Sequence, residues 1–110
     1  MISNGYLDLV IKQDAKQTLW TFSGVLSVFS LSQGENAKKW MKIFPKAGSW
    51  RISGKTLSKI DTAGLAFLIE CIRHAQEHQL ILKFSLPSSG VENLIHAHGV
   101  SALIEAHVES

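Results

Sequence analysis

The sequence predicts a single α/β domain in which helices cover a sheet mainly on one face. Some stretches alternate apolar and polar residues, as strands do, and others have helical periodicity. The two kinds of stretch follow one another along the chain. Such an order of strands and helices implies right-handed crossovers that place the helices against the sheet. A chain of 110 residues can bury one hydrophobic core but hardly two, so we expect one domain over residues 1–110.

The first two strands are expected to form a hairpin. Between Leu7 and Lys12 every second residue is apolar, which is the pattern of a half-buried strand. A second strand is expected over residues 18–24, "TLWTFSG", which are rich in aromatic and β-branched side chains and end in glycine. The polar residues 13–17 between them are few enough for a hairpin turn.

The middle of the chain is less regular. Residues 25–31 fit either an extended or a helical conformation, whereas the apolar residues of the segment 36–44 recur at helical spacing. A loop is expected over 45–49, followed by a short strand over 49–53, "SWRIS".

The second half of the chain alternates more clearly. A helix is expected from Asp61 to about His78, and a strand over residues 80–86, "LILKFSL", whose apolar side chains all lie on one face. The segment 87–89, "PSS", stops this strand and can cap a helix over about 90–98, which ends at a glycine. Residues 100–108 are expected to add a last strand or a helical turn.

Composition and charge exclude several classes of protein. Apolar residues make up 45% of the chain and charged residues 18%, which is typical of a folded domain and not of a disordered one. The net charge is only +2 and no more than two Lys or Arg are adjacent, so we expect no nucleic-acid partner. The N-terminus lacks the basic start of a secretory signal, and no apolar run is long enough to span a membrane. The single cysteine, Cys71, fits a reducing compartment, so the expected location is the cytoplasm.

The stretch "KIDTAGLAFLIECI", residues 59–72, holds the motif with the most functional interest. Asp61 is placed to cap the helix that follows, because its carboxylate can accept hydrogen bonds from the free N–H groups of the first turn. An aspartic protease would need Asp-Thr-Gly without the intervening alanine, together with a second Asp-Thr pair. A P-loop is equally unsupported, because "SGKT" at residues 53–56 lacks the upstream glycine, Gly48 being one residue too far away.

Two histidines raise the question of a metal site. His74 and His78 lie four residues apart on the predicted helix, one turn after Glu70, and this spacing can bind zinc. The sequence "HAQEH" lacks the glutamate of His-Glu-x-x-His, and no third ligand is apparent. An exposed polar face is the simpler interpretation, and we expect neither a metal nor another cofactor. Cys71 has no catalytic partner motif and is interpreted as a small apolar residue.

The periodicity of the predicted helix separates a buried from an exposed side. The expected buried stripe consists of Leu65, Leu68, Ile69, Ile72 and Ala75. The expected opposite side consists of Ala63, Phe67, Glu70, His74 and His78. Phe67 is unusual there, because a large aromatic side chain on a polar face is either covered by a neighbouring loop or available to a partner.

The stretch "ISGKTLSKIDTAGLAFLIECIRHAQEHQLILKF", residues 52–84, resembles the STAS domains of anti-sigma-factor antagonists and sulfate transporters. The similarity extends to "FSGVLS" near Gly24 and to "GVENLIHAHGVSALI" at residues 90–104, and so covers most of the chain. The turn Ile-Asp-Thr-Ala-Gly-Leu is most similar to that of the MlaB-like STAS proteins, which are small cytosolic subunits of bacterial phospholipid-transport ABC complexes. The resemblance implies the STAS fold, with a mixed sheet of four to five strands, helices mainly on one face, and an exposed turn before the second helix.

The resemblance also implies a function that needs no catalysis. In phospho-switch antagonists the third residue of the turn accepts phosphate, but here that place is Ala63, which has no hydroxyl. MlaB-like proteins carry threonine at the place of Thr62, where it contributes to docking on the transport ATPase. We therefore expect a subunit that binds the nucleotide-binding ATPase (MlaF-like) of a phospholipid ABC transporter at the cytoplasmic side of the inner membrane. The expected partner-binding residues are Asp61, Thr62, Ala63, Gly64, Phe67, Glu70 and His74.

Two alternatives stay open. A signalling adaptor similar to anti-sigma-factor antagonists could use Thr62 or Ser58 as phosphoacceptor. An isolated STAS domain that binds a nucleotide or another small molecule is the third hypothesis.

Overall fold

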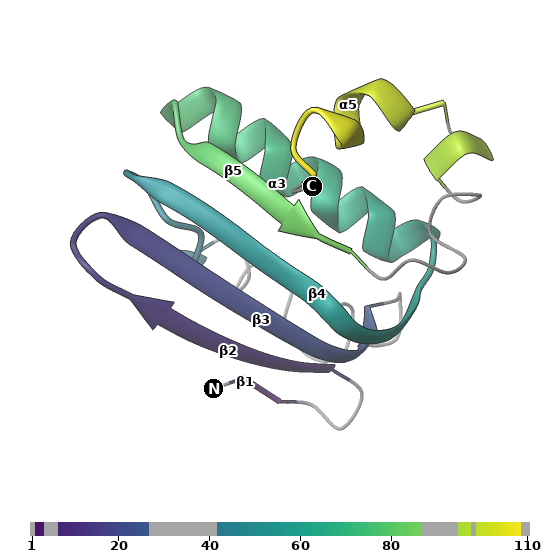
Figure 1. Ribbon diagram of the computed structural model, residues 1–110, viewed down its shortest axis with the longest axis horizontal. Coiled ribbons are helices and arrows are strands. Elements are labelled where there is room, and N and C mark those ends of the chain that lie inside the picture. Colours follow the sequence, from purple (N-terminus) through teal and green to yellow (C-terminus); the bar gives the residue numbers. More distant parts are fainter. Residues whose placement is uncertain (1, 4–6, 27–41, 87–94, 98, 109–110) are drawn as a thin grey trace.

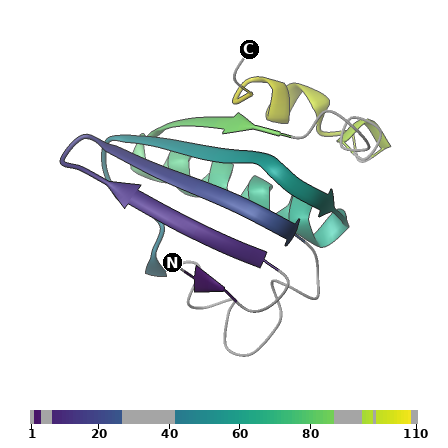
Figure 2. The ribbon, with the colours of Figure 1, turned by 60° about the horizontal axis from the view of Figure 1, so that its bottom comes forward.

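A computed structural model describes residues 2–3, 7–26, 42–86, 95–97 and 99–108. Five strands form one sheet in the order of the sequence: β1 (Ile2–Ser3), β2 (Leu7–Gln13), β3 (Gln17–Leu26), β4 (Ser49–Ile60) and β5 (Ile81–Ser85). Two labelled helices accompany it, α3 (Thr62–His78) and α5 (Ser101–Glu105). Figure 1 shows α3 behind the sheet, and Figure 2 confirms that it covers one face.

The sheet is mixed. β1, β2 and β3 pair antiparallel, whereas β3 pairs with β4 and β4 with β5 in parallel. The β2–β3 turn is closed by Asp14, whose carboxylate accepts from the backbone N–H groups of Lys16 and Gln17, each at 2.8 Å. Gly48, just before β4, has φ +87°, and a Cβ there would lie 2.6 Å from the Lys16 carbonyl oxygen. The hairpin therefore meets the start of β4 at a point where only glycine fits.

The hydrophobic core lies between the sheet and α3. Buried side chains from the sheet alternate with exposed ones, as expected for strands covered on one side only. The largest fully buried side chains are Trp20, Trp50, Phe22, Phe84, Leu9, Ile52, Leu68, Ile72, Leu82 and Ile104. The described residues therefore share one core, as a single domain requires.

The C-terminal segment closes the β5 edge of the sheet. The N–H of Phe84 donates to the His107 carbonyl oxygen at 2.7 Å, and Val108 forms a parallel bridge with Phe84. Figures 1 and 2 both show α5 beside β5. The expected last element is thus a helical turn followed by a strand-like contact.

The α/β fold class, the hairpin and the helix after Asp61 are confirmed, whereas the predicted end of β4 is wrong. The strand continues to Ile60 instead of stopping at Ser53, with irregular register to β3 beyond residue 53. At Gly54 the strand passes close to the end of β5, since a Cβ there would lie 3.0 Å from the Ser85 carbonyl oxygen. The helices expected over 36–44 and 90–98 fall largely outside the described residues.

None of the described helices is long and apolar enough to cross a membrane.

Candidate functional site

The turn before α3 is a capped helix start. Asp61 has extended backbone angles, φ −105° and ψ −171°, and its carboxylate accepts from the N–H of Gly64 at 2.9 Å. Its carbonyl oxygen accepts from the N–H of Leu65, also at 2.9 Å. The predicted cap is confirmed, and it fixes the position of the next residue, Thr62, which is exposed.

A solvent-facing ridge follows from this start along α3. We use this name for Thr62, Ala66, Glu70 and Arg73, which lie on one side of the helix because residues three and four apart share a face. Thr62, Ala66 and Arg73 are exposed, and the Arg73 guanidinium lies 3.3 Å from the Glu70 carboxylate. The opposite side is buried against the sheet. Thr62 and Glu70 are therefore brought together on an accessible surface.

Phe67 does not belong to this ridge. Its side chain is half-buried, and its ring packs edge-on against Phe22 and Phe44, with both pairs of ring centroids 6.0 Å apart. Phe44 comes from the segment before β4, so a neighbouring segment covers Phe67, as in the first of the two interpretations above. These contacts favour a covered Phe67 over a Phe67 that is available to a partner. The sequence pattern of one helix does not show what packs against its flank.

His74 is likewise part of the fold. Its Nε2 lies 2.6 Å from the Pro45 carbonyl oxygen, and because that oxygen can only accept, Nε2 carries the proton and donates. The ring centroid lies 5.0 Å from that of Phe44 and 6.1 Å from that of Trp50. The rings of His74 and His78 also pack together, with their centroids 4.2 Å apart. The expectation of an exposed polar face therefore fails for His74, which joins the aromatic cluster of Trp20, Phe22, Phe44, Trp50 and Phe67.

No group of three metal-ligating side chains occurs among the residues that the structure describes.

Cys71 lies on the buried side of α3. Its side chain is inaccessible, and burial, followed by the nearby Glu70 charge, raises the pKa of its thiol well above the usual value. A thiol held in its neutral form is a poor nucleophile, so the interpretation of Cys71 as a small core residue is supported.

The hydroxyl groups near the turn differ in their surroundings. Thr62 and Ser58 are both exposed, and the Ser58 hydroxyl, which lies on β4, donates to the Gly24 carbonyl oxygen at 3.0 Å. Thr56 donates to the Phe22 carbonyl oxygen at 2.7 Å, so both of these hydroxyls join β4 to β3 where their register is irregular. Ala63, which has no hydroxyl, is half-buried.

Two residues of the ridge were not predicted from the sequence. Ala66 and Arg73 follow Thr62 by one and three turns and are exposed. The same helical periodicity that identified Glu70 could have identified them, because both lie directly opposite the buried stripe.

A shallow hollow of about 350 Å³ lies at the opposite end of β3, lined by Lys12, Gln13, Asp14, Gln17 and Leu19. The Asp14 carboxylate in its wall already accepts two backbone hydrogen bonds of the turn. The hollow therefore offers no side-chain constellation for chemistry, and the turn before α3 is the stronger candidate site.

Comparison with known proteins identifies the fold. No protein-family profile matches the chain, and no curated protein matches its sequence significantly. Among solved structures, the unphosphorylated anti-sigma factor antagonist SpoIIAA superposes with a TM-score of 0.65 at 17% identity, over 93% of this chain and 86% of that one. An anti-sigma-factor antagonist STAS domain from Rhodobacter sphaeroides superposes with a TM-score of 0.57 at 11% identity, over 84% of this chain and 95% of that one. The sheet, the capped turn and the helix that follows are thus the parts of a domain with the STAS fold.

Proposed function

We propose that this domain is a non-catalytic adaptor that binds a partner protein through the solvent-facing ridge of α3. The observation that carries the proposal is the combination of a rigid capped start at Asp61 with the exposed side chains of Thr62 and Ala66 directly after it. Two small side chains allow close approach of a partner's backbone, and the threonine hydroxyl can form a hydrogen bond with it. Glu70 and Arg73 would form the polar rim of the contact.

The partner that we propose is the nucleotide-binding ATPase of a phospholipid ABC transporter, which the domain would stabilise or activate. The support for this partner is the resemblance of Ile-Asp-Thr-Ala-Gly-Leu, residues 60–65, to the turn of MlaB-like STAS subunits. The lack of a hydroxyl at Ala63 also favours a constitutive contact over one that phosphorylation switches. The domain would then act at the cytoplasmic side of the inner membrane, held there by the complex, in a system that maintains outer-membrane lipid asymmetry.

The test is co-purification of the tagged protein with the ATPase from detergent extracts of the cells that produce it. Wild type is compared with Thr62→Glu, which adds bulk and charge at the start of the ridge. Gln76→Glu is the matched control, because it adds the same charge at an exposed position near the other end of α3.

The expected result is retention of the ATPase by wild type and by Gln76→Glu, with at least a tenfold loss for Thr62→Glu, equivalent to about 1.4 kcal/mol of binding free energy. The urea unfolding curves of all three proteins should coincide, because both positions are exposed. Equal retention by Thr62→Glu would place the contact elsewhere, and absence of the ATPase from the wild-type sample would refute the proposed partner.

A signalling adaptor is the second candidate, favoured by the likeness to a solved anti-sigma factor antagonist. Thr62 would then be the phosphoacceptor, since it is exposed and lies in the turn itself, directly after Asp61. Incubation with a candidate kinase and ATP, followed by intact mass measurement, tests this. A mass increase of one phosphate that Thr62→Ala abolishes would support the signalling function, and an unmodified chain would count against it.

A further inference from the structure

The sheet face turned away from α3 carries a row of cations that the proposed function does not use. Lys12 on β2 pairs in register with Leu19 on β3, Leu19 with Arg51 on β4, and Arg51 with Lys83 on β5. We call Lys12, Arg51 and Lys83 the basic row. All three side chains are exposed, and at a strand spacing of about 4.8 Å the row extends over roughly 14 Å.

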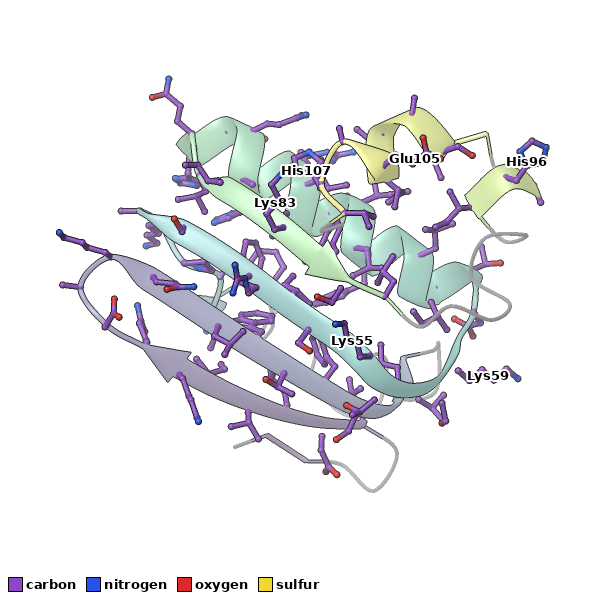
Figure 3. All side chains as sticks on the ribbon, viewed as in Figure 1. Lys55, Lys59, Lys83, His96, Glu105 and His107 are labelled. Carbon is purple, nitrogen blue, oxygen red and sulfur yellow. The ribbon has the colours of Figure 1, made fainter. Side chains whose placement is uncertain are left out.

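Further positive charge adds to this face. Lys55 is exposed on β4, and Figure 3 shows it on the same side of the sheet as Lys83. Two carboxylates lie near this face. Asp8 is half-buried and four residues before Lys12, about 13 Å along β2 from it. Asp14, in the turn, lines the same hollow as Lys12, and its carboxylate accepts two backbone hydrogen bonds. Within the described residues, Lys12, Lys55 and Lys83 form no ion pair. Among the described residues this face therefore carries more cations than anions, although the net charge of the chain is only +2.

The row places like charges side by side. Arg51 and Lys83 are Cα partners in the parallel β4–β5 ladder, and like charges on neighbouring strands repel each other. An anionic surface laid over the row would reduce this repulsion and attract the exposed ammonium groups of Lys12 and Lys83. The charge pattern therefore fits an acidic binding partner that extends over several strands.

Exposed aliphatic side chains flank the row on the same face. Val10 precedes Lys12 by two residues and is 40% exposed, and Ile81 precedes Lys83 by two residues and is 65% exposed. Residues two apart on a strand point to the same side, so the apolar and cationic side chains share one surface. The domain is also thin, with extents of 35, 31 and 21 Å, so this surface is broad for its size.

We propose that this face of the sheet binds peripherally to a membrane surface that contains acidic phospholipids. Cations attract anionic headgroups, and the flanking aliphatic side chains contact the boundary between headgroups and acyl chains. An acidic peptide fits less well, because an added peptide strand pairs at a sheet edge, whereas the row crosses the middle of the face and the β5 edge is bridged by Val108. The proposal does not depend on the ridge of α3, which lies on the other side of the sheet (Figure 2).

The test is co-sedimentation with vesicles of phosphatidylcholine alone and of phosphatidylcholine with about 30% phosphatidylglycerol, at about 0.1 M and 0.5 M salt. Wild type is compared with the row variant Lys12→Gln, Arg51→Gln, Lys83→Gln. The matched control is Lys42→Gln, Lys46→Gln, Arg73→Gln, which removes the same number of exposed charges from the segment before β4 and from α3. Thr62→Glu serves as a separate control for the α3 ridge.

Wild type, the matched control and Thr62→Glu should bind the acidic vesicles at low salt and dissociate at high salt, because salt screens the exposed charges. Each cation near an acidic membrane contributes about a fivefold increase in binding, so the row variant should bind about a hundredfold more weakly. Its urea unfolding curve is measured alongside, because Arg51→Gln also removes an interaction of Arg51 within the fold, and a cooperative transition shows that the row variant is folded.

The proposal would be overturned if wild type did not bind acidic vesicles, or if it bound neutral vesicles equally well. Equal loss of vesicle binding in the row variant and the matched control would also overturn it. So would binding of wild type to immobilised poly-glutamate without binding to vesicles. The last outcome would assign the row to an acidic protein segment. Because Thr62→Glu is included, failure of this proposal and failure of the proposed docking of α3 are distinguishable.

Discussion

The two flanks of α3 differ in what they contact. On one flank Thr62, Ala66 and Arg73 are exposed to solvent, whereas on the other Phe67 packs against Phe22 and Phe44, and His74 donates to Pro45. Both flanks lie outside the buried stripe of the helix, and the sequence gives them similar polar–apolar patterns. The difference arises from the segment before β4, which covers one flank and leaves the other open. The surface available to a partner is thus decided by a segment distant in sequence.

The largest effect is expected on the covered flank. Phe67→Ala removes a half-buried ring that contacts two core aromatics, so the free energy of unfolding should fall by about 2 to 3 kcal/mol, less than for a fully buried phenylalanine. Urea unfolding at neutral pH measures this loss. Phe67→Leu, which keeps most of the apolar volume, should restore more than half of it. If Phe67→Ala unfolded at the wild-type urea concentration, the contrast between the flanks would be wrong.

A smaller loss of stability is expected at the helix cap, from which both flanks of α3 begin. Asp61→Ala leaves the N–H of Gly64 without its carboxylate acceptor and should reduce the free energy of unfolding by about 1 kcal/mol. Asp61→Asn retains an acceptor oxygen and should lose less. The same urea experiment tests both, and a loss for Asp61→Asn as large as for Asp61→Ala would show that the hydrogen bond contributes little.

On the exposed flank, substitution should change binding and leave stability intact. Ala66→Asp adds a charge one turn after Thr62, and since Ala66 is exposed, the free energy of unfolding should change by less than about 0.5 kcal/mol. Retention of the proposed ATPase partner should fall with this substitution, as for Thr62→Glu. A large loss of stability in Ala66→Asp would mean that the ridge is covered in the folded chain.

The smallest effect at neutral pH concerns the buried side of the helix. Burial raises the pKa of the Cys71 thiol, so as the pH rises above 9.0 the unfolded chain loses this proton while the folded chain keeps it. The free energy of unfolding should therefore decrease at alkaline pH, and the decrease should be smaller in Cys71→Ala. Urea unfolding of both proteins between pH 7 and pH 10.5 measures the difference, and parallel pH curves would contradict it.

The sequence predicts the elements of this fold better than it predicts their surroundings. α3 was correct at both ends because Asp61 marks its start and its apolar residues keep helical spacing. β4 was cut short because Gly54 and Lys55 interrupt the alternation, and the pattern alone does not show that Gly54 lies against the Ser85 backbone.

The candidate site shows the same division. Thr62 was correctly placed on an exposed surface, because a residue directly after a helix cap has few neighbours. Phe67 and His74 were assigned to that surface too, but their contacts come from Phe44 and Pro45, and no local pattern in α3 contains this information. Contacts between distant segments are the part that periodicity does not encode.

The pairing of strands also bears on the order in which the chain folds. β2 and β3 are joined by residues 14–16 alone, whereas β4 reaches β3 only after residues 27–48, and β5 reaches β4 after the whole of α3. Closing these longer connections costs entropy before the parallel pairs are formed, so capture of β4 by the β2–β3 hairpin is the expected rate-limiting step of folding. Stopped-flow measurements would test this: Ile52→Val in β4 should slow folding, and Ile104→Val in α5 should mainly speed unfolding. The long central strand that carries the turn to its exposed position is then also the strand on which the folding rate depends.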